Sequence, residues 1–247
     1  MRETLEWATL LVCGAALLLR VPDAVRGRNR TVFGILFLGT LCSVLAVAEL
    51  YEAIDGTLGG WDLTSLILRY LVFATVLLVG LRVTRGLGAA RAYQLIAGGI
   101  GRWALGLGCL AVTVSFFLMG SYGSPAGLNA RAAGGAGDSD LAPLFTAAGR
   151  TYPAFVSLVL VAPLLAAVRS RLPRLVRAGA LLVLLGAAFA ALSLPAALTP
   201  SSWAGAQHFV NYAAALGYVV GLVVFWFSGL IASPSGNAGA TLRQNRD

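Results

Sequence analysis

Lysine is absent from this chain of 247 residues, in which all 18 basic residues are arginine. The absence excludes photochemistry of the retinal type, which needs a lysine to form a Schiff base. Charged residues of both signs are also scarce, because they make up 11% of the chain where about a quarter is usual in a soluble protein. Water is therefore not the main solvent expected for this protein.

Histidine is nearly absent too, with His208 as its single occurrence. One histidine excludes bis-histidine haem ligation within the chain and the histidine-rich metal centres of membrane enzymes. A serine nucleophile has only His208 as a partner base, and no GxSxG signature accompanies it. We therefore expect no enzymatic activity, no cofactor and no metal site.

Cysteine is limited to Cys13, Cys42 and Cys109, all within apolar runs. Their positions do not form a CxxC motif, and no histidine cluster accompanies them. We expect free thiols that pack as small hydrophobic side chains.

Long apolar runs are what the sequence has in abundance, with 58% hydrophobic residues overall. A helix needs about 20 residues to cross a hydrocarbon layer of ~30 Å. The sequence predicts an all-α polytopic membrane bundle in which residues 1–231 form a single seven-helix domain and residues 232–247 a flexible cytoplasmic tail. The predicted spans are residues 4–19, 31–50, 63–81, 103–120, 151–168, 178–198 and 209–231.

Arginines fall on alternate sides of these spans. Fourteen lie on one side and three on the other, with Arg69 inside a span. The smaller set is Arg2, Arg131 and Arg150. Short loops rich in Lys and Arg stay in the cytoplasm, so the pattern predicts an outside N-terminus, an inside C-terminus and a multi-pass protein of the bacterial cytoplasmic membrane. The formal charge of +8 is explained by these loops, and we expect no nucleic-acid binding.

Two segments interrupt the pattern. Residues 82–102 contain too many glycines and arginines for a clear span and are typical of a short helix on the cytoplasmic surface. Residues 121–150 are rich in glycine and alanine, and we interpret them as an outer loop linking two spans.

Small residues predict helix contacts, since close approach in lipid depends on small side chains facing one another. The last span has Ala213, Gly217 and Gly221 at four-residue spacing, and the preceding one has Gly186 and Ala190. We expect these residues to pack helices within the monomer.

Glu49 and Arg69 are the charges of most interest. If the second span continues as one helix to Asp55, Glu49 lies about 10 Å below its end, and Arg69 lies about 9 Å into the third span. Three interpretations stay open: an arginine that snorkels to headgroups, a salt bridge between two helices, and a ligand site facing the bundle interior. His208 and Asn211 join this candidate site if their helix turn faces it, whereas Glu52, Asp55 and Asp62 are expected to form a solvated acidic rim.

Two stretches also carry a resemblance, "LLLRVPDAVRGRNRTVFGILFLGTLCSVL" and "RSRLPRLVRAGALLVLLGAAFAAL". With the seven spans, they resemble an actinobacterial family of uncharacterised integral membrane proteins that are often labelled transporters. The resemblance covers residues 15–230 in layout and implies the topology more than a function.

Two kinds of function are expected on these grounds. In the first, the protein binds or transports a small molecule through an outward-facing polar pocket, with Arg69 for an anionic group and Glu49 as its counter-ion. In the second, it is a sensory or regulatory membrane protein that recruits a cytoplasmic protein to the Arg-rich loops. A structural subunit of a membrane complex is a third alternative.

Overall fold

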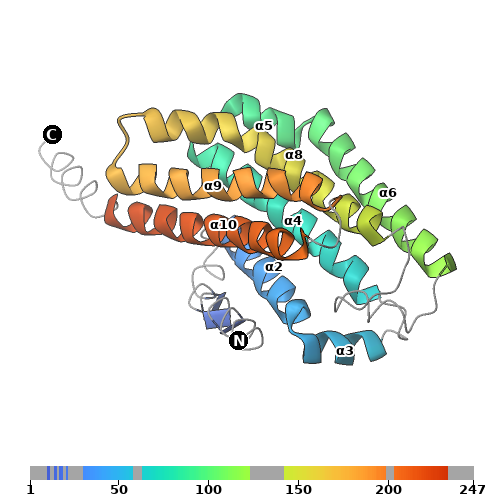
Figure 1. The fold of residues 1–247 in the computed structure, drawn as a ribbon. Helices are drawn as coiled ribbons and strands as arrows, with labels where there is room; N and C mark the ends of the chain where they lie inside the picture. Colours follow the sequence, from blue (N-terminus) through green and yellow to red (C-terminus); the bar gives the residue numbers. More distant parts are fainter. Residues whose placement is uncertain are drawn as a thin grey trace, which may run out of the picture.

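The structure is a computed structural model that describes residues 30–57, 63–122, 142–198 and 203–232, together with scattered residues between positions 10 and 21. The described helices that carry labels are α2 (Arg30–Ala46), α3 (Ala48–Thr57), α4 (Leu63–Gly86), α5 (Ala90–Ala97), α6 (Gly99–Tyr122), α8 (Ala142–Arg169), α9 (Arg174–Ala196) and α10 (Ala204–Ala232). They form an all-helical bundle whose long helices lie side by side (Figure 1).

Five of the described helices are long and apolar enough to cross a membrane. They are Leu63–Gly86, Gly99–Leu118, Pro143–Arg169, Arg174–Ala196 and Gly205–Phe225. These five match the third to seventh predicted spans, and the shorter apolar helix Phe33–Leu45 lies in the second. The long apolar helices indicate a multi-pass membrane protein. The first predicted span and the tail lie outside the continuously described ranges.

The direction of each helix follows from its side-chain contacts. The ring centroids of Phe73 and Tyr152 are 5.5 Å apart, and a Cβ on Gly80 would contact Val156, so α4 and α8 run parallel. Phe116 near the end of α6 packs on Phe145 near the start of α8, so these two helices are antiparallel. Helices that neighbour in sequence therefore alternate in direction through the bundle.

This alternation collects arginines at one end of the bundle, which we call the Arg-rich end. It comprises the end of α4, α5, the start of α6 and the α8–α9 turn, while α3 lies at the opposite end (Figure 1). The described arginines at this end are Arg82, Arg85, Arg91, Arg102, Arg169, Arg171, Arg174 and Arg177.

The second predicted span is not one helix. The structure ends α2 at Ala46 and begins α3 at Ala48, and α3 leaves the axis of α2 at a sharp angle (Figure 1). Val47 at the junction is buried. α3 carries Glu49, Glu52 and Asp55, and three carboxylates would be costly in the hydrocarbon layer of a membrane.

The interrupted segment 82–102 is helical for most of its length. α4 continues to Gly86, a turn with Gly88 at φ 66° follows, and α5 is a short helix whose Ala92 and Ile96 are buried. The guanidinium of Arg85 lies 4.8 Å from the Tyr93 ring centroid and fastens α5 to the end of α4. The expected short helix is therefore present.

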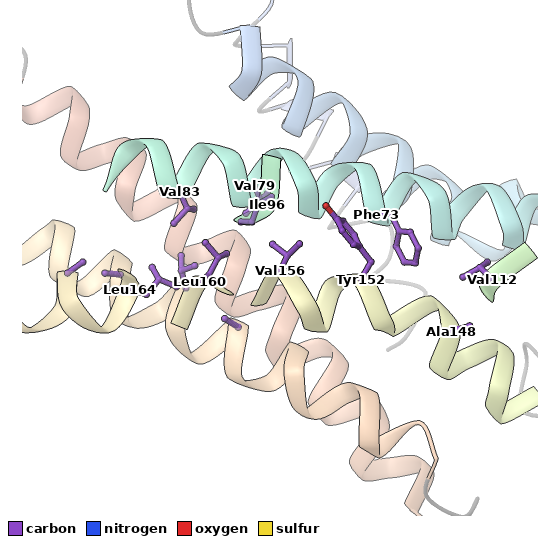
Figure 2. Close-up of a cluster of buried hydrophobic side chains, with 14 of the residues drawn as sticks. Phe73, Val79, Val83, Ile96, Val112, Ala148, Tyr152, Val156, Leu160 and Leu164 are labelled. Atoms are coloured by element: carbon purple, nitrogen blue, oxygen red, sulfur yellow. The ribbon is translucent and has the colours of Figure 1, made fainter. Parts of the chain in front are cut away.

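The core lies between α4, α5, α6, α8 and α9, as Figure 2 shows for its central part. Its largest fully buried side chains include Tyr152, Phe73, Ile96, Leu160 and Leu164. In contrast, α6 exposes large apolar side chains along its length, among them Trp103, Leu107, Leu110 and Phe117. An outer apolar surface of this kind suits contact with lipid.

The predicted contact between the last two long helices is confirmed. A Cβ added to Gly217 would lie 2.6 Å from Cα of Gly186, and one added to Gly221 would lie 2.8 Å from the backbone nitrogen of Val183. Such small distances require glycine on both helices. The small residues therefore pack α9 against α10 within the monomer.

Candidate functional site

Arg69 lies six residues into α4 and reaches across to α8. Its guanidinium carbon is 4.1 Å from the ring centroid of Phe145, which is a cation–π distance. Phe145 is itself buried and packs on Phe116 of α6, with ring centroids 6.1 Å apart. The position of Arg69 is therefore fixed by three helices, and its side chain is half-buried between them.

Gly149, one turn of α8 after Phe145, makes room for this side chain. A Cβ at position 149 would overlap the Arg69 guanidinium, so no other residue type fits without moving Arg69. Beside them lies a cavity of about 200 Å³, which we call the Arg69 cavity. Its lining residues are Ser65, Leu68, Arg69, Val72 and Gly149.

Pro153 changes the backbone of α8 next to this cavity. Proline has no N–H, so Pro153 cannot donate the usual helical hydrogen bond to the carbonyl of Gly149, four residues earlier. α8 remains helical through Pro153 and Pro163. The carbonyl of Gly149 is therefore an acceptor beside the cavity that receives no bond from residue 153.

Aromatic side chains separate the Arg69 cavity from the Arg-rich end. Phe73 and Tyr152 are both 1% exposed, and they fill the space between α4 and α8 one turn further along (Figure 2). Val156 and Leu160 continue the apolar packing beyond them. The Tyr152 hydroxyl is buried and has no hydrogen-bond partner within the described part of the chain. In this conformation these apolar side chains fill the space between α4 and α8 on that side of the cavity.

Arg150 is a second inward arginine that the sequence analysis missed. It was expected in an outer loop, but α8 begins at Ala142 and places Arg150 inside the helix. Its Nη1 donates a hydrogen bond of 2.7 Å to the carbonyl of Ser193 in α9. The apolar stretch "APLFTAAG" before it was the available signal for a longer helix.

Charges of both signs meet at this end of the bundle. The helices α4, α8 and α10 begin here, whereas α2, α6 and α9 end here, so the partial charges of helix N-termini and C-termini offset one another. α3 also brings the acidic residues Glu49, Glu52 and Asp55 to this end. Arg69 and Arg150 add two full positive charges, one contacting α8 from α4 and the other joining α8 to α9.

Asp55 differs from the sequence-based expectation. The solvated position predicted for it is wrong, because its side chain is 4% exposed and accepts a hydrogen bond of 3.3 Å from Oγ1 of Thr64 in α4. Thr64 precedes Arg69 by five residues, roughly 7.5 Å of helical rise. Asp55 is therefore a carboxylate that the structure places against α4, one and a half turns from Arg69.

The prediction that Glu49 and Arg69 lie at the same depth assumed that the second span is one continuous helix. The break at Val47 shows that it is not. The side chains of Glu49, Glu52 and His208, and the whole of Asp62, lie outside the described residues. Asn211 lies in α10 and is half-buried, but it does not line the Arg69 cavity. Of the candidate ligand-binding residues, the structure thus places Arg69 at a cavity, and a role for the other three stays a prediction.

Within the described ranges, no group of three or more His, Cys, Asp or Glu side chains could hold a metal ion. Cys42 and Cys109 are half-buried free thiols, and Cys42 Sγ lies 4.0 Å from Oγ1 of Thr75.

Comparison with known proteins finds no family model, no curated protein and no solved structure that matches this chain.

Proposed function

We propose that this multi-pass membrane protein binds a small anionic molecule in the Arg69 cavity and transports it through the bundle. The observation that carries the proposal is the Arg69 guanidinium, held beside a cavity of about 200 Å³ by Phe145 and Gly149. Guanidinium is a planar fork of N–H donors that suits carboxylate and phosphate groups. A charged side chain at membrane depth is costly, and it usually marks a ligand or ion pathway.

The volume of the cavity suits a small ligand. A water molecule occupies about 30 Å³ of liquid volume, so about 200 Å³ suits an anion of a few non-hydrogen atoms. Acetate, succinate and inorganic phosphate are of this size. Ser65 adds a hydroxyl to the lining, while Leu68 and Val72 suit a short hydrocarbon chain.

Transport requires the aromatic layer of Phe73 and Tyr152 to open. Pro153 and Pro163 interrupt the hydrogen bonds of α8 on the same stretch of helix, and such positions bend helices more easily than an uninterrupted backbone does. Bending of α8 separates Tyr152 from Phe73 and connects the cavity with the Arg-rich end.

We infer that the cavity opens to the outer side of the membrane, because the Arg-rich end is the one expected in the cytoplasm. Cysteine labelling tests this orientation in a cysteine-free background. Leu172→Cys in the α8–α9 turn should react with a membrane-impermeant maleimide only after permeabilisation, whereas Thr57→Cys at the end of α3 should react in intact cells. The reverse labelling pattern would overturn the orientation.

Thermal stability in the presence of anions tests binding. Acetate, succinate and inorganic phosphate are added separately to the full-length chain in detergent. A ligand at 100 times its Kd stabilises the folded state by about 2.7 kcal/mol, and we expect at least one of the three to do so. Arg69→Gln should abolish the stabilisation, because it removes the charge that faces the anion.

The matched control is Arg102→Gln, which removes the same charge from an exposed position on α6 at the Arg-rich end. This variant should respond to the anion as the unmodified chain does. Uptake of the stabilising anion into proteoliposomes then separates transport from binding alone. An anion response that survives Arg69→Gln would contradict the site.

A further inference from the structure

A second cavity lies at the Arg-rich end, where α8 turns into α9. Its volume is about 360 Å³, and it is lined by Val168, Arg174, Arg177, Ala178 and Leu181. We call it the corner groove. It lies at the opposite end of the bundle from the Arg69 cavity and shares no lining residue with it.

The two arginines of the groove sit at its rim. Nε of Arg177 donates a hydrogen bond of 3.0 Å to the carbonyl of Val168, near the end of α8. This bond fixes the base of the guanidinium and uses one of its five N–H donors. Arg174 lies in the first turn of α9 and is exposed, and within the described part of the chain it has no hydrogen bond or ion pair.

No acidic residue near in sequence neutralises this corner. Arg169, Arg171, Arg174 and Arg177 fall within nine residues, whereas the sequence has no Asp or Glu between Asp140 and Asp247. Among the described residues, Asp55 is the acidic residue whose side chain is placed, and it accepts a hydrogen bond at the start of α4, at the other end of the bundle. Within the described part of the chain these four exposed positive charges have no carboxylate beside them, and a negatively charged ligand would complement them.

The rest of the groove is apolar and follows the helix axis. Arg174 and Leu181 are seven residues apart on α9, which corresponds to roughly 10 Å of helical rise. Leu181 is 45% exposed, and Val168 and Ala178 complete the apolar lining. The arginines lie at the end of two long apolar helices, so in a membrane that α8 and α9 cross the groove would run from headgroup level toward the hydrocarbon layer.

We propose that the corner groove binds an anionic phospholipid. The phosphate lies between Arg174 and Arg177, and an acyl chain follows Val168 and Leu181 along α9. Basic pockets between spanning helices on the cytoplasmic side are suited to anionic headgroups, and arginine pairs with phosphate through short, charge-assisted hydrogen bonds. A soluble anion would leave the apolar part of the groove unused.

Lipid binding is tested on the full-length chain in nanodiscs made from mixtures of phosphatidylglycerol and phosphatidylcholine. The measured quantity is the enrichment of phosphatidylglycerol among lipids that remain bound after gentle extraction into detergent, read by native mass spectrometry. We expect enrichment for the unmodified chain and a loss of about 30-fold for Arg174→Gln/Arg177→Gln. Arg174→Gln alone keeps the bond from Arg177 to α8 and should lose part of the enrichment.

The matched control is Arg91→Gln/Arg102→Gln, which removes two exposed arginines from α5 and α6 at the same end and leaves the groove intact. It should retain the enrichment. An equal loss in both double variants would overturn the proposal in favour of diffuse surface charge. Displacement of the lipid by millimolar glycerol phosphate would assign the groove to a soluble anion instead. Unchanged enrichment in Arg174→Gln/Arg177→Gln would show that the lipid does not bind in the corner groove.

Discussion

Gly186→Leu is expected to prevent stable packing of α9 on α10. A Cβ at this position would lie 2.7 Å from the backbone nitrogen of Tyr218 and 2.9 Å from the carbonyl carbon of Gly217. Both obstacles are backbone atoms of a helix and cannot rotate away. Overpacking of a core costs about 1–3 kcal/mol where side chains can adjust, so we expect a loss of more than about 3 kcal/mol here.

The measurement is the free energy of unfolding from a denaturant titration in mixed micelles. Gly106→Leu is the matched control, because Gly106 lies in α6 with open space around its Cβ position and the same substitution there should change stability little. Gly217→Leu in α10 should lower the free energy of unfolding by a similar amount, since its Cβ would lie 2.6 Å from Cα of Gly186. Equal stability of the Gly186 and Gly106 variants would show that α9 and α10 do not pack through this glycine.

The contact between α9 and α10 was predictable from sequence because both sides of it are visible as small residues at helical spacing. Gly217 and Gly221 are one turn apart, and Gly186 comes from the neighbouring helix. The apolar spans were predictable for a similar reason, since twenty consecutive apolar residues have few other structural explanations. Patterns of this kind are local properties of the chain.

The break between α2 and α3 was not predictable in the same way. No glycine or proline lies between Gly39 and Gly56, so the sequence contains no helix-breaking residue at Val47. Asp55 was misplaced for the same reason: its burial depends on Thr64 of another helix. Both outcomes are tertiary, and a depth calculation along one ideal helix could not include them.

The candidate site around Arg69 could be predicted from the sequence only in part. Its depth in a span identified it as unusual, because charges are rare there. Its partners were not visible, since Phe145 and Gly149 lie in a segment that the many glycines and alanines before it made look like a loop. The start of α8 therefore had to be known before Phe145, Gly149 and Arg150 could be assigned to the same end of the bundle.

Gly149→Ala is expected to leave the fold intact and to weaken anion binding strongly. The added methyl group would overlap the Arg69 guanidinium, but that group is the end of a flexible side chain and can turn aside. Displacement removes charge-assisted hydrogen bonds worth about 1.5–3 kcal/mol each, which corresponds to an affinity loss of roughly 10- to 100-fold. The methyl group also takes up part of the small Arg69 cavity.

The measurement is the anion-dependent shift in thermal stability, compared with the unfolding free energy of the same variant without anion. Gly106→Ala introduces the same methyl group at an open position of α6 and should preserve both quantities. Because Gly149→Ala retains Arg69 itself, loss of the anion response with normal stability would assign binding to the position of the guanidinium and not merely to its charge. An unchanged response would mean that the anion contacts Arg69 in an orientation that Gly149 does not determine, and the cavity would then not be the binding site.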